Sequence, residues 1–449
     1  MITLHPAKVI SFLMLLVTVY SINQWSKIDL GNTFVWWVID LFVLVEFVKA
    51  KKLYYDIDNN RFIRVIYLFL AWNIICVIRG LFVADNYWQW KDLTGNAIIF
   101  LMPLSIYVTT NKQLMQNIIG SWFKYALPAF ILFVPIFALP DAMGRYLVPV
   151  SFAALFFPVL SKKWKIITLI FTLIVIFGAL DARSSVIKFS LSLLLSSIYL
   201  FRKLFIVKLL GVIRLLLLIM PIILFSLALS GVFNIFRMDD YIKGDYKTTV
   251  VQDGATEEES LTVDTRTFLY QEVLASAVKY NYIWLGRTPA RGNESPSFGE
   301  YSMDVLKTGT MDRPYNEAGI LNTFTWTGLV GVILYFLVFY QASYLAIKKS
   351  SNIFIKIVGT YVAFRWAFSW VEDFSAFDLS YFYLWVLIGM CFSKSFREMD
   401  DLQMKNWILG IFDKRYRVLD IDLNESTDDN EVILNQHNMA VLKTSPVCS

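Results

Sequence analysis

Hydrophobic and polar positions alternate along this chain in long blocks. With a window of about 20 residues, the length a helix needs to cross a bilayer, twelve apolar segments can be read. The segments are 8–23, 30–49, 62–83, 93–109, 122–140, 145–160, 164–181, 184–201, 208–233, 318–347, 354–371 and 380–393. The sixth is short, and both it and 93–109 could be tilted or re-entrant. We therefore predict an all-α polytopic membrane protein with about 12 transmembrane helices.

The composition supports this prediction. Hydrophobic residues make up 57% and charged residues only 17% of the 449 positions, whereas soluble domains are about 45–50% apolar. This balance excludes a soluble enzyme, a disordered chain and a disulfide-stapled secreted domain. No small-residue cleavage pattern follows segment 8–23, so we expect it to be the first span and not a removable signal peptide.

The positions of the basic residues predict an orientation. Lys and Arg gather in alternate short loops, for example at 49–52, 162–165 and 348–349, and are sparse in the loops between. Because cytoplasmic loops carry the excess of basic residues, we predict that both termini are cytoplasmic. The net charge of +5 therefore reflects topology, and we expect no nucleic-acid partner.

One loop is much longer than the others and is predicted to lie outside the cytoplasm. Between Arg237 and Arg313 it holds nine basic and thirteen acidic residues. We expect Asp253–Ser260 to be solvated and mobile, and 264–282 to form a helix with Asp264 or Thr265 at its start. The predicted parts are thus helices 1–9 in 1–235, the loop in 236–317, helices 10–12 in 318–393, and a polar cytoplasmic tail in 394–449.

The sequence has no phosphate-binding glycine loop and no metal-binding motif. The two histidines, His5 and His437, fall on the predicted cytoplasmic side. We therefore predict that neither a metal nor a cofactor is used and that histidine does not act on the outer face.

Arginines and carboxylates at the outer ends of helices are the remaining candidates. The arginines are Arg183, Arg266, Arg287, Arg291, Arg313 and Arg365. Each has an ordinary alternative: Arg183 could pair with Asp181 or extend to the headgroups, and Arg266 could be a solvated surface residue. Arg365 lies deeper in a span, where a cation needs a carboxylate or phosphate partner.

Two polar clusters accompany these arginines. Glu372 and Asp373 end one predicted span, where a hydrated loop is the ordinary explanation. Residues 315–317, Tyr-Asn-Glu, stand at the start of another span, which continues to Gly328 and Gly331. Glycines at this spacing also have a simple packing explanation, since small residues allow helices to approach closely.

Three local patterns occur in one order along the chain. Ala182-Arg183-Ser184 opens a span, DTRTFLYQEVLASAVKYNYIWLGR leads from an arginine through a helix to a glycine turn, and YNEAGILNTFTWTGLVGVIL leads to G-x-x-G and an apolar helix. Together, over roughly 164–393, they resemble the O-antigen polymerase and O-antigen ligase superfamily. Tyr315 stands where that family often has a histidine, which favours a polymerase over a ligase.

The resemblance implies a fold similar to membrane glycosyltransferases of the GT-C class, in the bacterial inner membrane. It implies a polymerase that joins undecaprenyl-diphosphate-linked oligosaccharide repeat units on the outer face, with donor and acceptor glycans, membrane lipids and a chain-length regulator as partners. Its motif positions assign Arg183 and Arg266 to the diphosphate. Arginine forks suit a diphosphate leaving group, so we add Arg287, Arg291 and Arg365. For the catalytic base and its neighbours the predicted residues are Glu317 first, oriented by Tyr315 and Asn316, with Asp373 and Glu372 in reserve.

Three other functions remain open. A ligase would transfer the finished glycan to lipid A core or protein. A transporter of lipid-linked glycans is disfavoured because the sequence shows no paired broken helices in two halves. A non-catalytic envelope scaffold would not need its outer arginines.

Overall fold

The computed structural model describes residues 6–55, 60–178, 182–237, 240–241, 247–252, 255–260, 264 and 266–417. His5, Asp181, Thr265 and His437 lie outside the described residues, as does the end of the predicted tail after residue 417.

The described chain is mostly helical. Its α-helices are α1 (Pro6–Tyr20), α2 (Thr33–Tyr54), α3 (Asn60–Leu81), α4 (Tyr87–Phe100), α5 (Ile106–Thr109), α6 (Lys112–Ser121), α7 (Leu127–Phe133), α8 (Asp141–Tyr146), α9 (Val148–Ala154), α10 (Lys162–Gly178), α11 (Arg183–Ser196), α12 (Val207–Leu229), α13 (Thr267–Lys279), α14 (Pro296–Glu300), α15 (Gly319–Lys348), α16 (Ile353–Phe368), α17 (Leu379–Phe392), α18 (Lys394–Glu398) and α19 (Asp401–Phe412). Two small antiparallel hairpins pair β1 (Lys247–Gln252) with β2 (Ala255–Ser260) and β3 (Asn293–Glu294) with β4 (Asp312–Arg313).

Six helical segments of the described part are long and apolar enough to cross a membrane. They are Pro6–Trp25, Arg61–Leu81, Tyr87–Thr109, Lys112–Ile136, Val207–Leu229 and Gly319–Lys348. The protein is therefore an all-α, multi-pass membrane protein in its architecture. The count of twelve spans stays a prediction.

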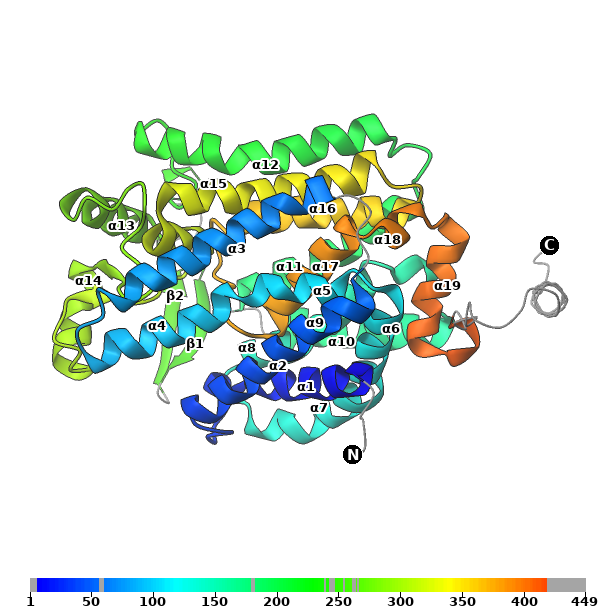
Figure 1. Cartoon of the computed structure of the whole chain (residues 1–449), viewed down its shortest axis with the longest axis horizontal. Helices are drawn as coiled ribbons and strands as arrows, with labels where there is room; N and C mark the ends of the chain where they lie inside the picture. Colours follow the sequence, from blue (N-terminus) through cyan, green and yellow to red (C-terminus); the bar gives the residue numbers. More distant parts are fainter. Residues whose placement is uncertain are drawn as a thin grey trace, which may run out of the picture.

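The long helices form a bundle with two different ends. Helix α15 packs on α16 and α3, and α16 in turn packs on α12 and α17. The hairpin β1–β2 and helices α13 and α14 gather at one end, which we call the loop end, and α19 lies at the opposite end, which we call the tail end (Figure 1). The outer side of α12 exposes residues such as Leu216 and Ile223, as expected for a surface that faces lipid.

Several predicted spans differ from the observed helices, and two of them show the physical reason. Segment 145–160 is divided into α8, α9 and a short 3-10 turn, because Pro149 stands in the first turn of α9 and Pro158 in that of the 3-10 turn. Proline cannot donate the backbone hydrogen bond that a continuous helix requires. The helix predicted to begin at 122 begins ten residues earlier, where Asn111 caps the start of α6 by accepting from the backbone N–H of Leu114 at 2.9 Å.

The large loop is more ordered than its composition indicates. Residues 255–260 of the segment predicted to be solvated and mobile form strand β2, which pairs along its whole length with β1. The predicted loop helix is confirmed as α13. Its N-cap is Arg266 and not the predicted Asp264 or Thr265. Asp264 lies two residues earlier, and its Oδ1 accepts from the backbone N–H of Thr267 at 2.8 Å.

Gly328 breaks α15 and lets the large loop join the bundle. Its φ of +67° is not helical, and the freed backbone groups bond to the loop instead: Leu329 N–H donates to Ile283 O at 2.8 Å and Arg287 N–H to Thr325 O at 2.7 Å. The G-x-x-G motif thus fixes residues 283–287 of the large loop to the membrane helix.

Gly328→Ala is expected to destabilise this junction. A Cβ at Gly328 would lie 2.3 Å from Trp284 O, and the positive φ adds strain of about 1–3 kcal/mol. Thermal unfolding of the purified variant should show a clear fall in Tm. Gly178→Ala is the matched control, because its Cβ would meet nothing closer than Met143 Sδ at 3.8 Å; equal Tm values for both variants would contradict the assignment.

Candidate functional site

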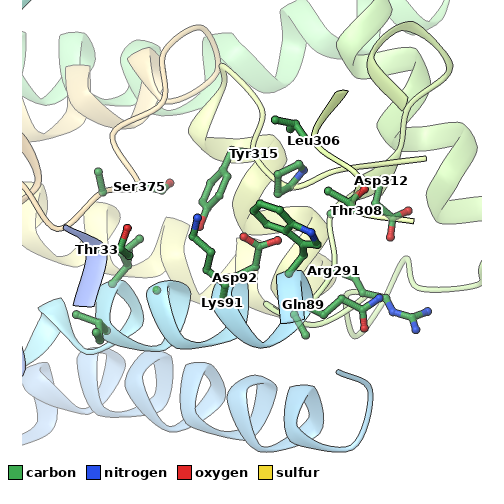
Figure 2. A pocket seen from close by; sticks show the side chains of 18 of the residues that line it. Thr33, Gln89, Lys91, Asp92, Arg291, Leu306, Thr308, Asp312, Tyr315 and Ser375 are labelled. Carbon is green, nitrogen blue, oxygen red and sulfur yellow. The ribbon is translucent and has the colours of Figure 1, made fainter. Parts of the chain in front are cut away.

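A cavity of about 640 Å³ opens at the loop end of the bundle. Five separate parts of the chain line it: the end of α1, the start of α2, most of the length of α4, segment 290–315 of the large loop, and the connection 373–377 between α16 and α17. Figure 2 shows Lys91 and Asp92 rising from α4 on the side where Tyr315 points down from the loop.

The lining combines aromatic rings with hydrogen-bonding groups. The rings are Tyr20, Trp37, Trp88, Tyr315 and Phe377, and the amides and hydroxyls are Gln24, Thr33, Asn86, Gln89, Ser302, Thr308, Thr310 and Ser375. Flat apolar surfaces next to a few fixed polar groups are typical of small-molecule sites.

The ionisable side chains that line the cavity are mainly acidic. They are Asp40, Asp92, Asp312, Asp373, Lys91 and Arg291. Asp312 is paired with Arg287 at 2.6 Å and Arg291 with Asp85 at 2.8 Å, so these two charges are compensated by residues outside the lining. Three carboxyl groups then remain beside one ammonium group. Such a lining is unsuitable for a diphosphate and suitable for hydroxyl groups, which can donate to the carboxyl oxygens.

Of these carboxyl groups, that of Asp40 is fully buried and that of Asp373 is half-buried. Asp40 is 1% exposed, and within the described part of the chain its Oδ1 has no hydrogen-bond partner. Asp373 accepts from the backbone N–H of Ser375 at 2.8 Å, yet burial outweighs this bond and raises the pKa of Asp373 above its ordinary value. An aspartate with a raised pKa in a cavity is suited to accept a proton from a hydroxyl group.

A backbone network fixes the position of Tyr315. Asn316 N–H donates to Asn322 Oδ1 at 2.7 Å, and the Asn322 amide returns a bond to Asn316 O at 2.9 Å. The Asn316 amide donates to Asn293 Oδ1 at 2.9 Å, and Arg313 Nε donates to Tyr315 O at 3.0 Å. Asn316 is buried and holds the wall of the cavity, so it is a positioning residue for Tyr315.

Glu317 lies beside the cavity between two arginines. Arg266, just before α13, donates through Nη1 to Glu317 Oε2, and Arg313 reaches Glu317 Oε1 at 3.4 Å. The Glu317 side chain is 54% exposed. We call Arg266, Arg313 and Glu317 the arginine cluster; it is the place at the loop end where two guanidinium groups could meet one anion.

An apolar groove of about 340 Å³ begins next to the arginine cluster. Its walls are residues of α12, of the segment 234–236, of α13 and of the end of α16, including Phe225, Phe236, Thr267, Tyr270, Leu274 and Trp370. Thr267 follows Arg266 directly, so the groove and the cluster share one end of α13.

Glu372 and Arg365 lie in the interior and do not line the cavity. Lys188 Nζ pairs with Glu372 Oε1 at 2.7 Å, and both side chains are about a tenth exposed. Arg365 is 4% exposed and its guanidinium stacks over Phe374 at 4.5 Å. Among the described residues, Arg365 Nε and Nη2 have no hydrogen-bond partner.

The predicted arginines do not converge on one site. Arg291 lines the cavity and Arg266 is in the arginine cluster. Arg287 binds Asp312 and donates to Gly292 O at 2.7 Å, where it joins the loop to β4. Arg183 is exposed at the first position of α11.

Sequence reasoning missed Asp40, Asp92 and Lys188. Asp40 and Lys188 interrupt apolar segments, and an ionisable residue within such a segment is by default a functional candidate. That signal was present for both. Asp92 stands at the edge of a segment and could be recognised only once α4 was placed beside the loop.

No family model matches this chain, no curated protein matches it as a relative, and no solved structure matches its fold.

Proposed function

We propose that this protein is a polymerase that joins lipid-diphosphate-linked glycan repeat units. The observation that carries the proposal is the order of three neighbouring features at the loop end: an apolar groove, a cluster of two arginines and a cavity lined by rings and carboxylates. These match, in the same order, the isoprenoid tail, the diphosphate and the sugars of one lipid-linked glycan.

The arginine cluster suits the diphosphate. Arg266 and Arg313 already hold one carboxylate between them, and guanidinium groups bind phosphate in the same forked geometry. A diphosphate would replace Glu317, which is half exposed and free to turn outward. Three other predicted arginines contribute only from a distance, through the electrostatic field; they are Arg183, Arg287 and Arg365.

The cavity suits the sugars of the donor together with the acceptor sugar that attacks them. Sugar rings have apolar faces that pack on aromatic side chains, and their hydroxyls donate to carboxylate and amide oxygens. Asp373 takes the proton from the acceptor hydroxyl as that oxygen forms a bond to the anomeric carbon of the donor. The bond from this carbon to the phosphate oxygen breaks, and Arg266 and Arg313 stabilise the departing diphosphate.

The experiment that tests the function is a gel of the glycans from cells lacking the gene, with lipid-linked intermediates extracted in parallel. A polymerase predicts that long chains vanish and single repeat units persist. Long chains that remain on the lipid carrier and never reach their acceptor would indicate a ligase. Unchanged glycans would contradict the proposal.

A size series at Gly95 tests whether the cavity is the glycan site. Gly95 faces the cavity, and a Cβ there would lie 3.7 Å from Trp37 Nε1 and 3.8 Å from Tyr315 Oη. Gly95→Ala should therefore keep most of the activity, whereas Gly95→Leu fills the cavity and should reduce polymer formation at least about tenfold. Both variants should show normal protein levels; full activity of Gly95→Leu would exclude this cavity.

A further inference from the structure

A second polar cavity, of about 890 Å³, lies at the tail end of the bundle. It is formed by residues 158–165 at the start of α10, by Tyr199, and by α19 with the turn that follows it. Figure 1 shows α19 at the end of the molecule opposite α13 and α14, so this cavity is separate from the site proposed for polymerisation. We call it the tail-end groove.

The tail-end groove is strongly basic. Its cations are Lys163, Lys165, Lys405, Lys414 and Arg415. Among the described residues that line the groove, the carboxylate is Asp413, which is bound by Arg415 at 2.7 Å. Four lysines are therefore left to face an anion.

The walls of the groove are held rigidly. Trp407 of α19 donates through Nε1 to Lys112 O at 2.7 Å, and the Gln116 amide donates to Trp407 O at 2.7 Å. Trp164 at the start of α10 stacks on Phe412 at the end of α19, with ring centroids 4.3 Å apart. The basic side chains thus project from two elements that are fixed to each other.

Apolar surface continues outward from the groove. Beyond its lysines, α10 exposes Ile166, Ile170 and Phe177, which are 53%, 50% and 70% exposed. After Tyr199, Leu200 and Leu204 are 67% and 69% exposed. A ligand held here would have its charge among lysines and its remaining part along apolar helices.

We propose that the tail-end groove binds the phosphate headgroup of an anionic phospholipid. Basic pockets at the membrane boundary attract such headgroups, and Trp and Tyr are typical of that boundary. A soluble phosphate or an acidic peptide would use the lysines but not the apolar surface beside them. The combination therefore favours a lipid, and it does not depend on the function proposed above.

Native mass spectrometry of the full-length protein tests this proposal. The protein is reconstituted with phosphatidylglycerol or phosphatidylcholine and then stripped stepwise with detergent. We expect phosphatidylglycerol to stay bound at detergent levels that remove phosphatidylcholine. The variant Lys163→Gln, Lys165→Gln, Lys405→Gln, Lys414→Gln should hold it at least about tenfold more weakly.

The matched control removes the same charge elsewhere. Lys52→Gln, Lys348→Gln, Lys349→Gln and Lys394→Gln replace four lysines that lie in the other predicted cytoplasmic loops. This control should retain phosphatidylglycerol as the unmodified protein does, and both variants should elute as folded species of normal size. Equal lipid loss from both variants, no preference for phosphatidylglycerol, or displacement of the lipid by inorganic phosphate alone would each overturn the proposal.

Discussion

Asp373→Asn is expected to stop polymer formation while single repeat units accumulate. Asp373 lines the cavity close to Tyr315 and Ser375, and burial raises the pKa of its carboxyl group. Asparagine keeps the size and the bond to Ser375 N–H but cannot accept a proton. Because general bases contribute about 10²- to 10⁴-fold to a rate, we expect a loss in this range in an assay with purified protein and lipid-linked repeat units.

The pH dependence provides a second readout for Asp373. A base must be ionised, so the rate should rise as the pH increases through the pKa of Asp373, and the raised pKa moves this acid limb above the ordinary range of an aspartate. Asp304→Asn is the control, since Asp304 is an exposed aspartate of the large loop that does not line the cavity. If Asp373→Asn were fully active and Asp92→Asn inactive, the base would be Asp92.

The sequence predicted the features that depend on local chemistry. The apolar segments that became α12 and α15 and the amphipathic loop helix follow from composition over a few turns of helix. The motif at Gly328 was also visible. Its role was not, because the backbone of residues 283–287 that bonds to the broken helix lies about 40 residues away in the chain.

Averaging over a window hides interruptions within apolar segments. Pro149 and Pro158 divide one predicted span, and Pro103 begins the 3-10 turn that follows α4. A hydropathy window gives proline little weight, although each one removes a backbone donor. The predicted bounds of individual spans were therefore less accurate than the prediction of a polytopic membrane protein.

The cavity could be predicted only in part because its residues come from five regions of the chain. Tyr315 and Asp373 were recognised because each ends or begins an apolar segment. Asp40 was hidden inside such a segment, and nothing in the sequence indicates that it faces the same space as Asp92. Similarly, the sequence favoured Glu317 as the base because it stands at the start of a span. It did not show that Arg266 and Arg313 bind the two carboxylate oxygens of Glu317.

Arg266→Lys is expected to be as damaging as Asp373→Asn, but for a different reason. Lysine keeps the positive charge and loses the forked pair of donors. If Arg266 and Arg313 stabilise the departing diphosphate, removal of one such donor should lower the polymerisation rate about 10²- to 10³-fold. Arg237→Lys is the control, because Arg237 is a largely exposed loop arginine whose only described ion pair, to Asp264, spans 3.6 Å.

Glu317→Gln distinguishes two roles for Glu317: a carboxylate that holds Arg266 and Arg313, or the catalytic base. If Glu317 only holds Arg266 and Arg313 until a diphosphate arrives, the variant loses an exposed ion pair worth about 0–1 kcal/mol, and its activity should change less than about fivefold. It should also bind the lipid diphosphate at least as tightly, because a competing carboxylate is gone. A Glu317→Gln variant as inactive as Arg266→Lys, together with an active Asp373→Asn, would instead make Glu317 the base, as the sequence alone predicted.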